Sequence, residues 1–188
     1  MKVNITNQHW LTFALLLICS GLWAQQLTPI DIAERHLQEN YSEWNLTKGD
    51  VSNLKVNDHY THSQTGISYV YYLQQFQDIE IHNAILNFAI KEGKVFHIGN
   101  RFISNLAEKV NTTVPTLTPV QAIQNASSHY KVLSNQTFRQ LSKNGNEYIF
   151  EKGDIAREDI IANLIFEPNG EKVTLAWNII FAPVESHD

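Results

Sequence analysis

Histidine, acidic and hydroxyl side chains are the groups of this chain that could carry out hydrolysis. A zinc peptidase needs two His four residues apart on a helix, with a Glu beside the first. Both rings then face one metal ion and the carboxylate reaches its bound water. The sequence has eight His but no His-Glu-x-x-His. We therefore predict that the chain contains no zinc-peptidase centre.

The remaining histidines and acids have spacings that do not suit a metal. His59 and His62 lie in a segment expected to be extended, where side chains three residues apart point to opposite faces. His82 and His97 are far apart in the expected strand pairing. The acidic run 151–159 lacks the alternating oxygen ligands of a calcium loop, which favours a solvated loop. The sequence predicts no metal site.

Patterns for a nucleophile or a phosphate site are also missing. A Ser nucleophile needs a sharp strand-to-helix turn such as G-x-S-x-G, and the sequence has none. Gly93 and Gly99 lie in or beside an expected hairpin, not ahead of a helix, so they do not form a phosphate cradle. The single Cys, Cys19, lies in the N-terminal apolar segment. We predict no catalytic residue, no cofactor and a function exerted by binding, so the chain is not expected to be an enzyme.

The first two dozen residues have the pattern of a secretory signal peptide. Lys2 provides a basic start, residues 11–22 form a short apolar run, and Ala24 is a small residue at the expected cleavage point. An uncleaved anchor is the alternative, but the apolar run is short for a membrane span. A lipoprotein signal is disfavoured because Ile18 before Cys19 is large. We expect a secreted, periplasmic or extracellular product without membrane contact after cleavage.

The charge of the chain limits its partners. The formal net charge is −5, and loss of Lys2 with the signal peptide would make it more negative by one. A negative surface repels phosphate groups, which disfavours nucleic acid and anionic membrane as partners. The length after cleavage allows one ordinary domain or two small ones.

Two similar helix starts divide the chain. Thr28-Pro29 and Thr118-Pro119 each place a capping residue ahead of a proline at the first helical position. Apolar residues then recur at helical spacing and predict two amphipathic helices: Ile30, Ala33, Leu37, Tyr41 and Trp44 in the first, and Val120, Ile123, Ala126 and Tyr130 in the second.

Strand patterns follow each helix. After the first helix they occupy residues 51–60 and 69–76 and two runs that meet at 91–93; after the second, residues 137–141, 147–151, 160–167 and 172–182. The prediction is an α+β fold with two successive units of one helix packed on an antiparallel β-sheet, with cystatin-like character. We expect a signal peptide at 1–24, a first unit at 25–105, a linker at 106–116 and a second unit at 117–188, truncated at its C-terminus.

Facing apolar residues suggest the register of the first hairpin. A three-residue loop, 91–93, that ends in a left-handed glycine would place Phe88 opposite Phe96 and Leu86 opposite Ile98 in the core. The strand 69–76 is aromatic or branched on both faces, which suits an inner strand.

A second hairpin is expected around Asn169-Gly170, with Glu167 opposite Lys172 and Leu164 opposite Leu175. Large aromatic residues such as Tyr69, Tyr71 and Trp177 are expected in the core more than on a binding surface.

The run from Val70 to Phe102 resembles the conserved segment in the propeptide of fungalysin- and thermolysin-type metallopeptidases. Gln75 stands at the family's Gln, 79–81 (Ile-Glu-Ile) at its Ile-Pro-Val or Ile-Glu-Val, and 92–95 (Glu-Gly-Lys-Val) at its Asp-Gly-Lys-Val turn. Asp78 replaces the usual Gly of one turn. The resemblance makes Gln75, Ile79, Ile81 and Gly93 the candidate family-motif or partner-contact residues. Gln75 is expected either to bond backbone at the end of its strand or to contact the cognate protease.

The second unit resembles the PepSY-like region that follows this propeptide segment in fungalysins. Its Leu-Thr-Pro helix start and its Leu175-Ala176-Trp177 strand match that region. The resemblance implies a pro-region that assists folding of a secreted fungalysin-like metallopeptidase, inhibits it, and binds its catalytic domain in cis or in trans. The alternative is a stand-alone secreted protease inhibitor or protein-binding module acting in trans.

Overall fold

The computed structural model describes residues 27–130 and 137–184, so the expected signal peptide at 1–24 lies outside the described residues. The fold is α+β, as predicted, with a mixed sheet and a few helices. In chain order the elements are α2 (Pro29–Asn40), the 3-10 helices η2 (Tyr41–Trp44) and η3 (Gly49–Val51), β1 (Leu54–Thr61), β2 (Ser68–Phe76), β3 (Ile79–Lys91), β4 (Lys94–Asn100), α3 (Leu106–Lys109), α4 (Pro119–His129), β5 (Gln140–Asn144), β6 (Glu147–Phe150), β7 (Ile160–Asn169) and β8 (Lys172–Ile180).

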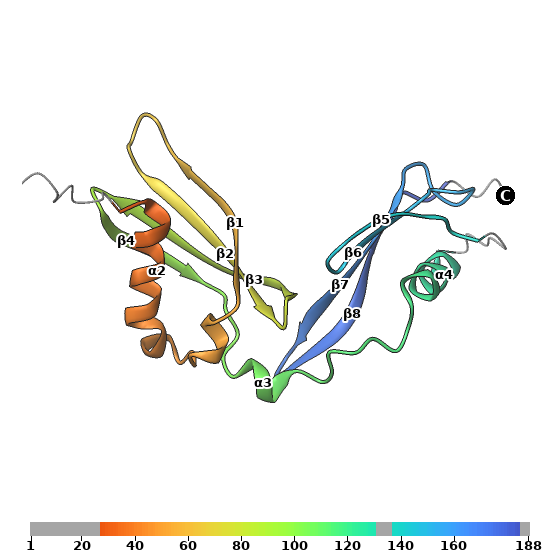
Figure 1. Cartoon of the computed structure of the whole chain (residues 1–188), viewed down its shortest axis with the longest axis horizontal. Helices are drawn as coiled ribbons and strands as arrows, with labels where there is room; N and C mark the ends of the chain where they lie inside the picture. Colours follow the sequence, from red (N-terminus) through yellow and green to blue (C-terminus); the bar gives the residue numbers. More distant parts are fainter. Residues whose placement is uncertain (1–26, 131–136, 185–188) are drawn as a thin grey trace, which may run out of the picture.

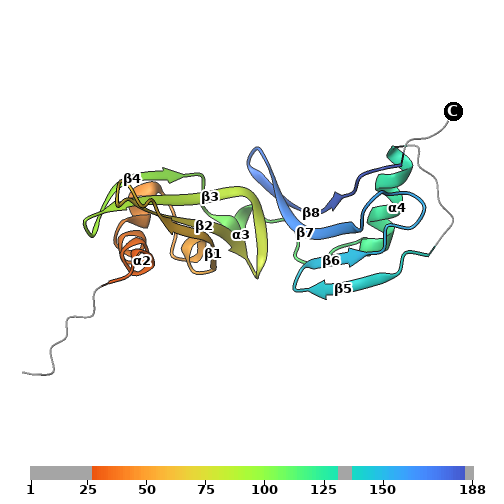
Figure 2. The same ribbon diagram turned by 90° about the horizontal axis from the view of Figure 1, so that it is seen from above.

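The strands form one continuous sheet that is narrow in its middle. The order is β1-β2-β3-β7-β6-β5, with β4 also paired to β3 and β8 also paired to β7. Neighbours within each half are antiparallel, whereas β3 and β7 are parallel and joined by the single pair Ile81 and Phe166. We call α2 with β1–β4 the first arm, and α4 with β5–β8 the second arm. Figure 1 shows the arms as an open V with α3 at its base, and Figure 2 shows from above that the two arms lie one beyond the other with α3 between them.

Both helices start as the sequence predicts. The Thr28 hydroxyl accepts from the backbone N–H of Asp31, while the Asp31 carboxylate accepts from the backbone N–H of Thr28 at 2.8 Å. Thr118 and Gln121 make the same reciprocal bonds at the start of α4. These capping boxes satisfy backbone donors that the first turn of a helix leaves without partners.

Each helix covers one face of its own sheet. In the first arm, Ala33 and Leu37 of α2 pack on Val70, Leu86 and Phe88, so the expected helix stripe faces the sheet. In the second arm, Ile123 packs among buried residues that include Phe138, Phe150, Ile160 and Ala162. Tyr130, expected in the stripe of α4, is its C-cap and is exposed.

A third cluster lies where the arms meet. It brings Ile79 and Ile81 of β3 together with Leu106 of α3, Phe166 of β7 and Val173 of β8. The segment 106–116, expected to be a linker, therefore begins with a short helix whose Leu106 is buried. Charged and polar neighbours masked this single apolar anchor in the sequence pattern.

The expected register of the first hairpin is wrong by two residues. Phe88 pairs with Ile98, not with Phe96, which is 57% exposed. The loop has two residues, because Glu92 and Gly93 both have positive φ (51° and 74°), as the preferred two-residue hairpin turn requires. A β-bulge at Phe96 then absorbs one residue and keeps Ile98 on the core side.

The second hairpin departs from expectation in the same way. Asn169 pairs with Lys172 around a two-residue turn at 170–171, so Leu164 lies opposite Trp177 and not opposite Leu175. Gly170 has a φ of 61°, which a glycine adopts without steric cost. A tight turn with the glycine as its first central residue thus fixes this register, and the facing apolar pairs follow from it.

Candidate functional site

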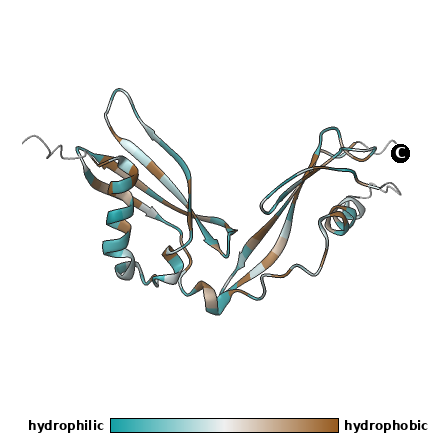
Figure 3. Ribbon diagram, in the orientation of Figure 1, coloured by the Kyte–Doolittle hydropathy of each residue, from teal (hydrophilic) through white to brown (hydrophobic). Residues whose placement is uncertain are grey.

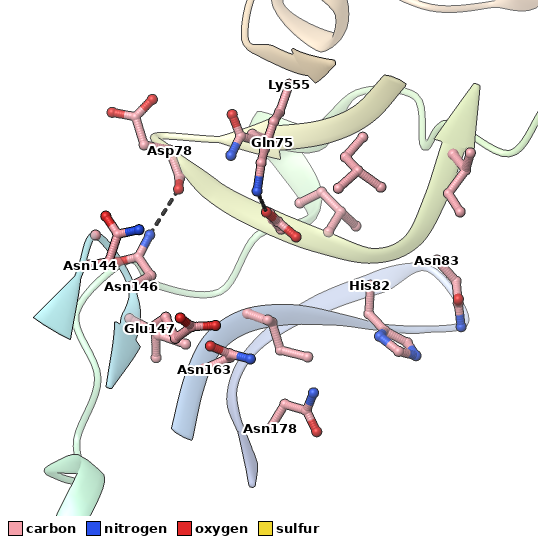
Figure 4. A pocket seen from close by; sticks show the side chains of 17 residues that line it. Lys55, Gln75, Asp78, His82, Asn83, Asn144, Asn146, Glu147, Asn163 and Asn178 are labelled. Carbon is pink, nitrogen blue, oxygen red and sulfur yellow. Dashed lines mark hydrogen bonds and ion pairs between the residues drawn. The ribbon is translucent and has the colours of Figure 1, made fainter. Parts of the chain in front are cut away.

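A cleft of about 710 Å³ opens between the two arms. Lys55, Leu73, Gln75 and Ile85 line it from the first arm. Asn163, Ile165 and Asn178 line it from the second, together with the β5–β6 turn at 144–147. Figure 4 shows these side chains converging from strands of both arms. A cleft of this size, lined by polar and apolar side chains from both arms, is a candidate binding site.

Strand alternation explains which side chains reach the cleft. In β2, Tyr72 and Gln74 are buried on the side of α2, while Leu73 and Gln75 face the opposite way. In β7, Ala162 is buried on the α4 side and Asn163 faces the cleft. The cleft is therefore formed by the two sheet faces that the helices leave uncovered.

Two polar contacts shape the rim of the cleft. Lys55 and Glu80 form a half-exposed ion pair with 2.6 Å between Nζ and Oε1. Such a pair contributes little stability in water, but it neutralises two charges at this place. Across the arms, the Asn146 side-chain amide donates to the backbone oxygen of Asp78 at 2.8 Å (Figure 4).

Five cleft amides of the described chain, which are Asn83, Asn144 and the three named next, keep their hydrogen-bonding capacity. Within the described residues, the side chains of Gln75, Asn163 and Asn178 make no hydrogen bond to the protein. Each amide group offers two donors and one acceptor. The cleft thus presents neutral groups that match the pairing needs of a peptide main chain.

Tyrosines extend the wall of the first arm beyond the cleft. The Tyr60 ring lies 5.2 Å from that of Tyr69 and 6.3 Å from that of Tyr71, centroid to centroid. Tyr69 and Tyr71 were expected in the core, but they are half-exposed because they share the face of Leu73 and Gln75. A hydrogen bond with Tyr60, with burial second, raises the pKa of Tyr71.

The structure places the four candidate residues from the resemblance in different environments. Gln75 and Ile81 both line the cleft, and Gln75 pairs with Glu80 across β2 and β3. Ile79 and Ile81 are buried in the cluster between the arms. Gly93 lies in the β3–β4 turn and is not among the residues that line the cleft. Gln75, Ile79 and Ile81 therefore lie in the cleft or in the cluster beside it, and Gly93 lies apart from them.

Sequence reasoning missed a buried carboxylate, Asp50, which is only 2% exposed. Its oxygens accept from the backbone N–H groups of Thr47 (2.8 Å), Asn105 (2.9 Å) and Leu106 (2.9 Å), and from the Thr47 hydroxyl. Burial by itself raises the pKa of Asp50, but these hydrogen bonds outweigh it and hold the pKa below its ordinary value. The available signal was Thr47-x-x-Asp50, a capping-box pattern inside a presumed loop.

Sequence reasoning also missed Gln74, the neighbour of the expected Gln75. The Gln74 side chain is fully buried and bonds three times to backbone: it donates to the oxygens of Asp50 (3.1 Å) and Ile103 (2.8 Å) and accepts from Ile103 N–H at 2.8 Å. Backbone bonding of the kind expected of Gln75 is thus made by Gln74. We call these residues the Asp50–Gln74 network; it ties the 47–50 loop to β2 and to the entry of α3.

The described residues contain no cluster of side chains suited to a metal ion. Among them, no three His, Cys, Asp or Glu side chains are grouped so that they could hold a metal ion. His59 lies in β1 opposite Val70, whereas His62 lies past the strand end beside Thr65. In the same part of the chain, no helix is both long and apolar enough to cross a membrane.

Comparison with known proteins relates this sequence to extracellular metalloproteinases. Residues 52–102 match the family model described as Fungalysin/Thermolysin Propeptide Motif. Extracellular metalloproteinase 10 of Coccidioides posadasii (strain C735) is 28% identical over 127 residues, covering 66% of this chain and 20% of that protein. Extracellular metalloproteinase 9 of Uncinocarpus reesii (strain UAMH 1704) is 28% identical over 130 residues, with the same coverage of 66% and 20%.

The matched motif coincides with the sheet of the first arm, from just before β1 to just after β4. The chain spans about one fifth of the length of the curated relatives it matches. The match is to the non-catalytic propeptide of fungalysin precursors and not to their peptidase domain. Residues 52–102 are therefore similar to a fungalysin/thermolysin propeptide motif, and about two thirds of the chain is similar to one fifth of the length of fungal extracellular metalloproteinases.

Proposed function

We propose that this protein is a non-catalytic pro-region that assists the folding of a secreted fungalysin-like metallopeptidase and inhibits it. The observation that supports this most is that the propeptide motif, 52–102, forms a sheet with one face covered by α2 and the other open to the cleft. A pro-region needs such an uncovered surface, because it acts through contact with another folded unit.

The proposal includes the arrangement expected from the sequence. Residues 1–24 act as a signal peptide for secretion, 25–105 and 117–188 are two helix-on-sheet units of cystatin-like character, and 106–116 connects them. The separate helix-covered cores of the two arms support this division. The catalytic domain is the partner, in cis or in trans, and Gln75, Ile79, Ile81 and Gly93 are candidate contact or motif residues.

The physical basis of both activities is selective binding. A partner that binds the native form but not the unfolded chain shifts the equilibrium toward the native form. It also lowers the folding barrier if it binds native-like forms on the way. The surface of the pro-region is held by its own cores, so little of the binding free energy is lost in ordering it.

Refolding tests this function. A fungalysin-type catalytic domain is denatured and refolded with and without the purified chain, and activity is scored after the chain is removed. We expect higher recovery with the chain present, and slower turnover while it is bound. Unchanged recovery together with no binding would favour a stand-alone module acting on another target. Zinc-dependent proteolysis by the chain itself would contradict both.

A further inference from the structure

The uncovered faces of both arms are more apolar than solvent-facing sheets normally are. Antiparallel sheets with one face in water usually carry polar residues there. Here β2 presents Tyr69, Tyr71 and Leu73, and β7 presents Ile161 and Ile165, all half-exposed. Figure 3 shows hydrophobic colour along much of β7, which contains apolar residues on both faces of the sheet. Because α2 and α4 already complete the two cores, these residues are left for a contact outside the chain.

The uncovered faces of the two arms flank one cleft, which Leu73 lines from the first arm and Ile165 from the second. The floor between them offers the unpaired amides of Gln75, Asn163 and Asn178. The lining also contains the Lys55–Glu80 ion pair and the carboxylates of Asp78 and Glu147. Main-chain N–H and C=O groups are the natural complement of such amides, and apolar side chains are the complement of the walls. This chemistry suits a projecting polypeptide segment better than an anionic ligand, which the carboxylates of Asp78 and Glu147 would repel.

The cleft is formed before any partner arrives. The cluster of Ile79, Ile81, Leu106, Phe166 and Val173 joins the arms, and the bond from Asn146 to Asp78 bridges them at the rim. A partner therefore meets two walls already held apart at a fixed separation.

We propose, building on the proposed function, that the peptidase catalytic domain docks between the arms. A mostly apolar loop or hairpin of that domain inserts into the cleft. Its side chains pack on the Tyr69–Tyr71 wall and the Ile161–Ile165 wall, and its backbone bonds to the floor amides. The outer faces of α2 and α4 stay in water.

The test uses charge-matched variants of the full chain. Tyr71→Arg and Ile165→Arg each place a cation on one wall, whereas Gln38→Arg and Gln124→Arg place it on exposed positions of α2 and α4. Binding of a separately produced fungalysin-type catalytic domain is measured by surface plasmon resonance. We expect each wall variant to raise Kd by about thirtyfold or more, as interface hot spots do, and each helix variant to leave it within about twofold.

A milder variant keeps the test informative if the charged variants do not fold. Gln75→Ala removes one floor amide without introducing charge, and we expect it to raise Kd by about fivefold or more because it leaves partner groups unpaired. Thermal unfolding of each variant establishes that it is folded before its Kd is compared.

The outcomes separate this inference from the function on which it rests. If the wild-type chain binds no such catalytic domain, both fail. If it binds and the wall variants bind equally well, or the helix variants lose binding, only the cleft inference fails. Sedimentation that shows self-association of the wild type, abolished by Tyr71→Arg and Ile165→Arg, would assign the cleft to a second copy of the chain and overturn it.

Discussion

The two arms begin alike but are stabilised differently. Each has a Thr-capped helix over a sheet, yet the first arm encloses the Asp50–Gln74 network, with a buried charge and an amide that ties three backbone segments. In the described part of the second arm, the buried polar residue is Ser127, whose hydroxyl bonds within its own helix. The comparison teaches that the first arm combines apolar packing with a directional, charge-dependent tie, while the second relies mainly on packing.

The largest expected effect concerns packing, which both arms share. Phe88→Ala in the first arm and Phe150→Ala in the second remove nearly fully buried rings. Each should cost about 3–5 kcal/mol of unfolding free energy, measured by urea unfolding. The control is Phe96→Ala, which should cost far less because the Phe96 side chain is exposed. Equal losses for Phe88 and Phe96 would contradict the observed hairpin register.

Removing the buried charge of Asp50 in the first arm should destabilise the protein more than removing the buried hydroxyl of Ser127 in the second arm. Asp50→Asn keeps the shape of the side chain but replaces one acceptor oxygen with a donor that would face backbone N–H groups. We expect a loss of about 1–3 kcal/mol. Ser127→Ala in the second arm should cost less, since it removes one local bond. If both variants melt alike in urea, the first arm has no special dependence on its network.

Acidic pH should lower the stability of the wild type more than that of Asp50→Asn. The pKa of Asp50 is lower in the fold than its ordinary value of about 3.9. A depressed carboxyl pKa stabilises the fold above the unfolded-state pKa, and this contribution is lost as the pH falls through the folded-state pKa. We expect stability to fall below about pH 4 in the wild type and to fall less in Asp50→Asn. Unfolding curves between neutral and acid pH test this, and parallel curves for the two proteins would contradict it.

The smallest effect should be equal in the two arms. Thr28→Ala and Thr118→Ala each remove the hydroxyl of a capping box. Each should cost about 1 kcal/mol, seen as a small shift in the urea midpoint. Unequal costs would indicate that one helix depends more on its cap than on its sheet.

The sequence pattern was sufficient for features that depend on neighbouring residues. Thr28-Pro29 and Thr118-Pro119 predicted both helix starts, and the aromatic and branched residues on both faces of 69–76 predicted an inner strand. Both features depend on residues close together in the sequence. The hairpin registers could not be obtained that way. Facing apolar pairs are compatible with two registers of the same parity, and only the two-residue turns and the bulge at Phe96 choose between them.

The candidate site was less predictable because it depends on distant contacts. Gln75 was identified by resemblance, but Asn163 and Asn178, the amides that line the cleft with it, come from the other arm. Asp50 looked like an ordinary loop acid, since its burial depends on the return of residues 105–106. Tyr69 and Tyr71 looked like core residues because hydrophobicity does not tell which face of a sheet a helix will cover.

The single parallel pair between Ile81 and Phe166 has a consequence for the order of folding. The hairpins of each arm close short loops, whereas this junction closes a loop that includes β4, α4 and most of the second sheet. Forming contacts between distant parts of a chain costs more loop entropy, and such contacts generally form late. During synthesis the first arm can therefore assemble before the second has left the ribosome. The two walls acquire their final spacing only in the last folding step, so a pro-region interrupted before β7 would have a folded motif and no cleft.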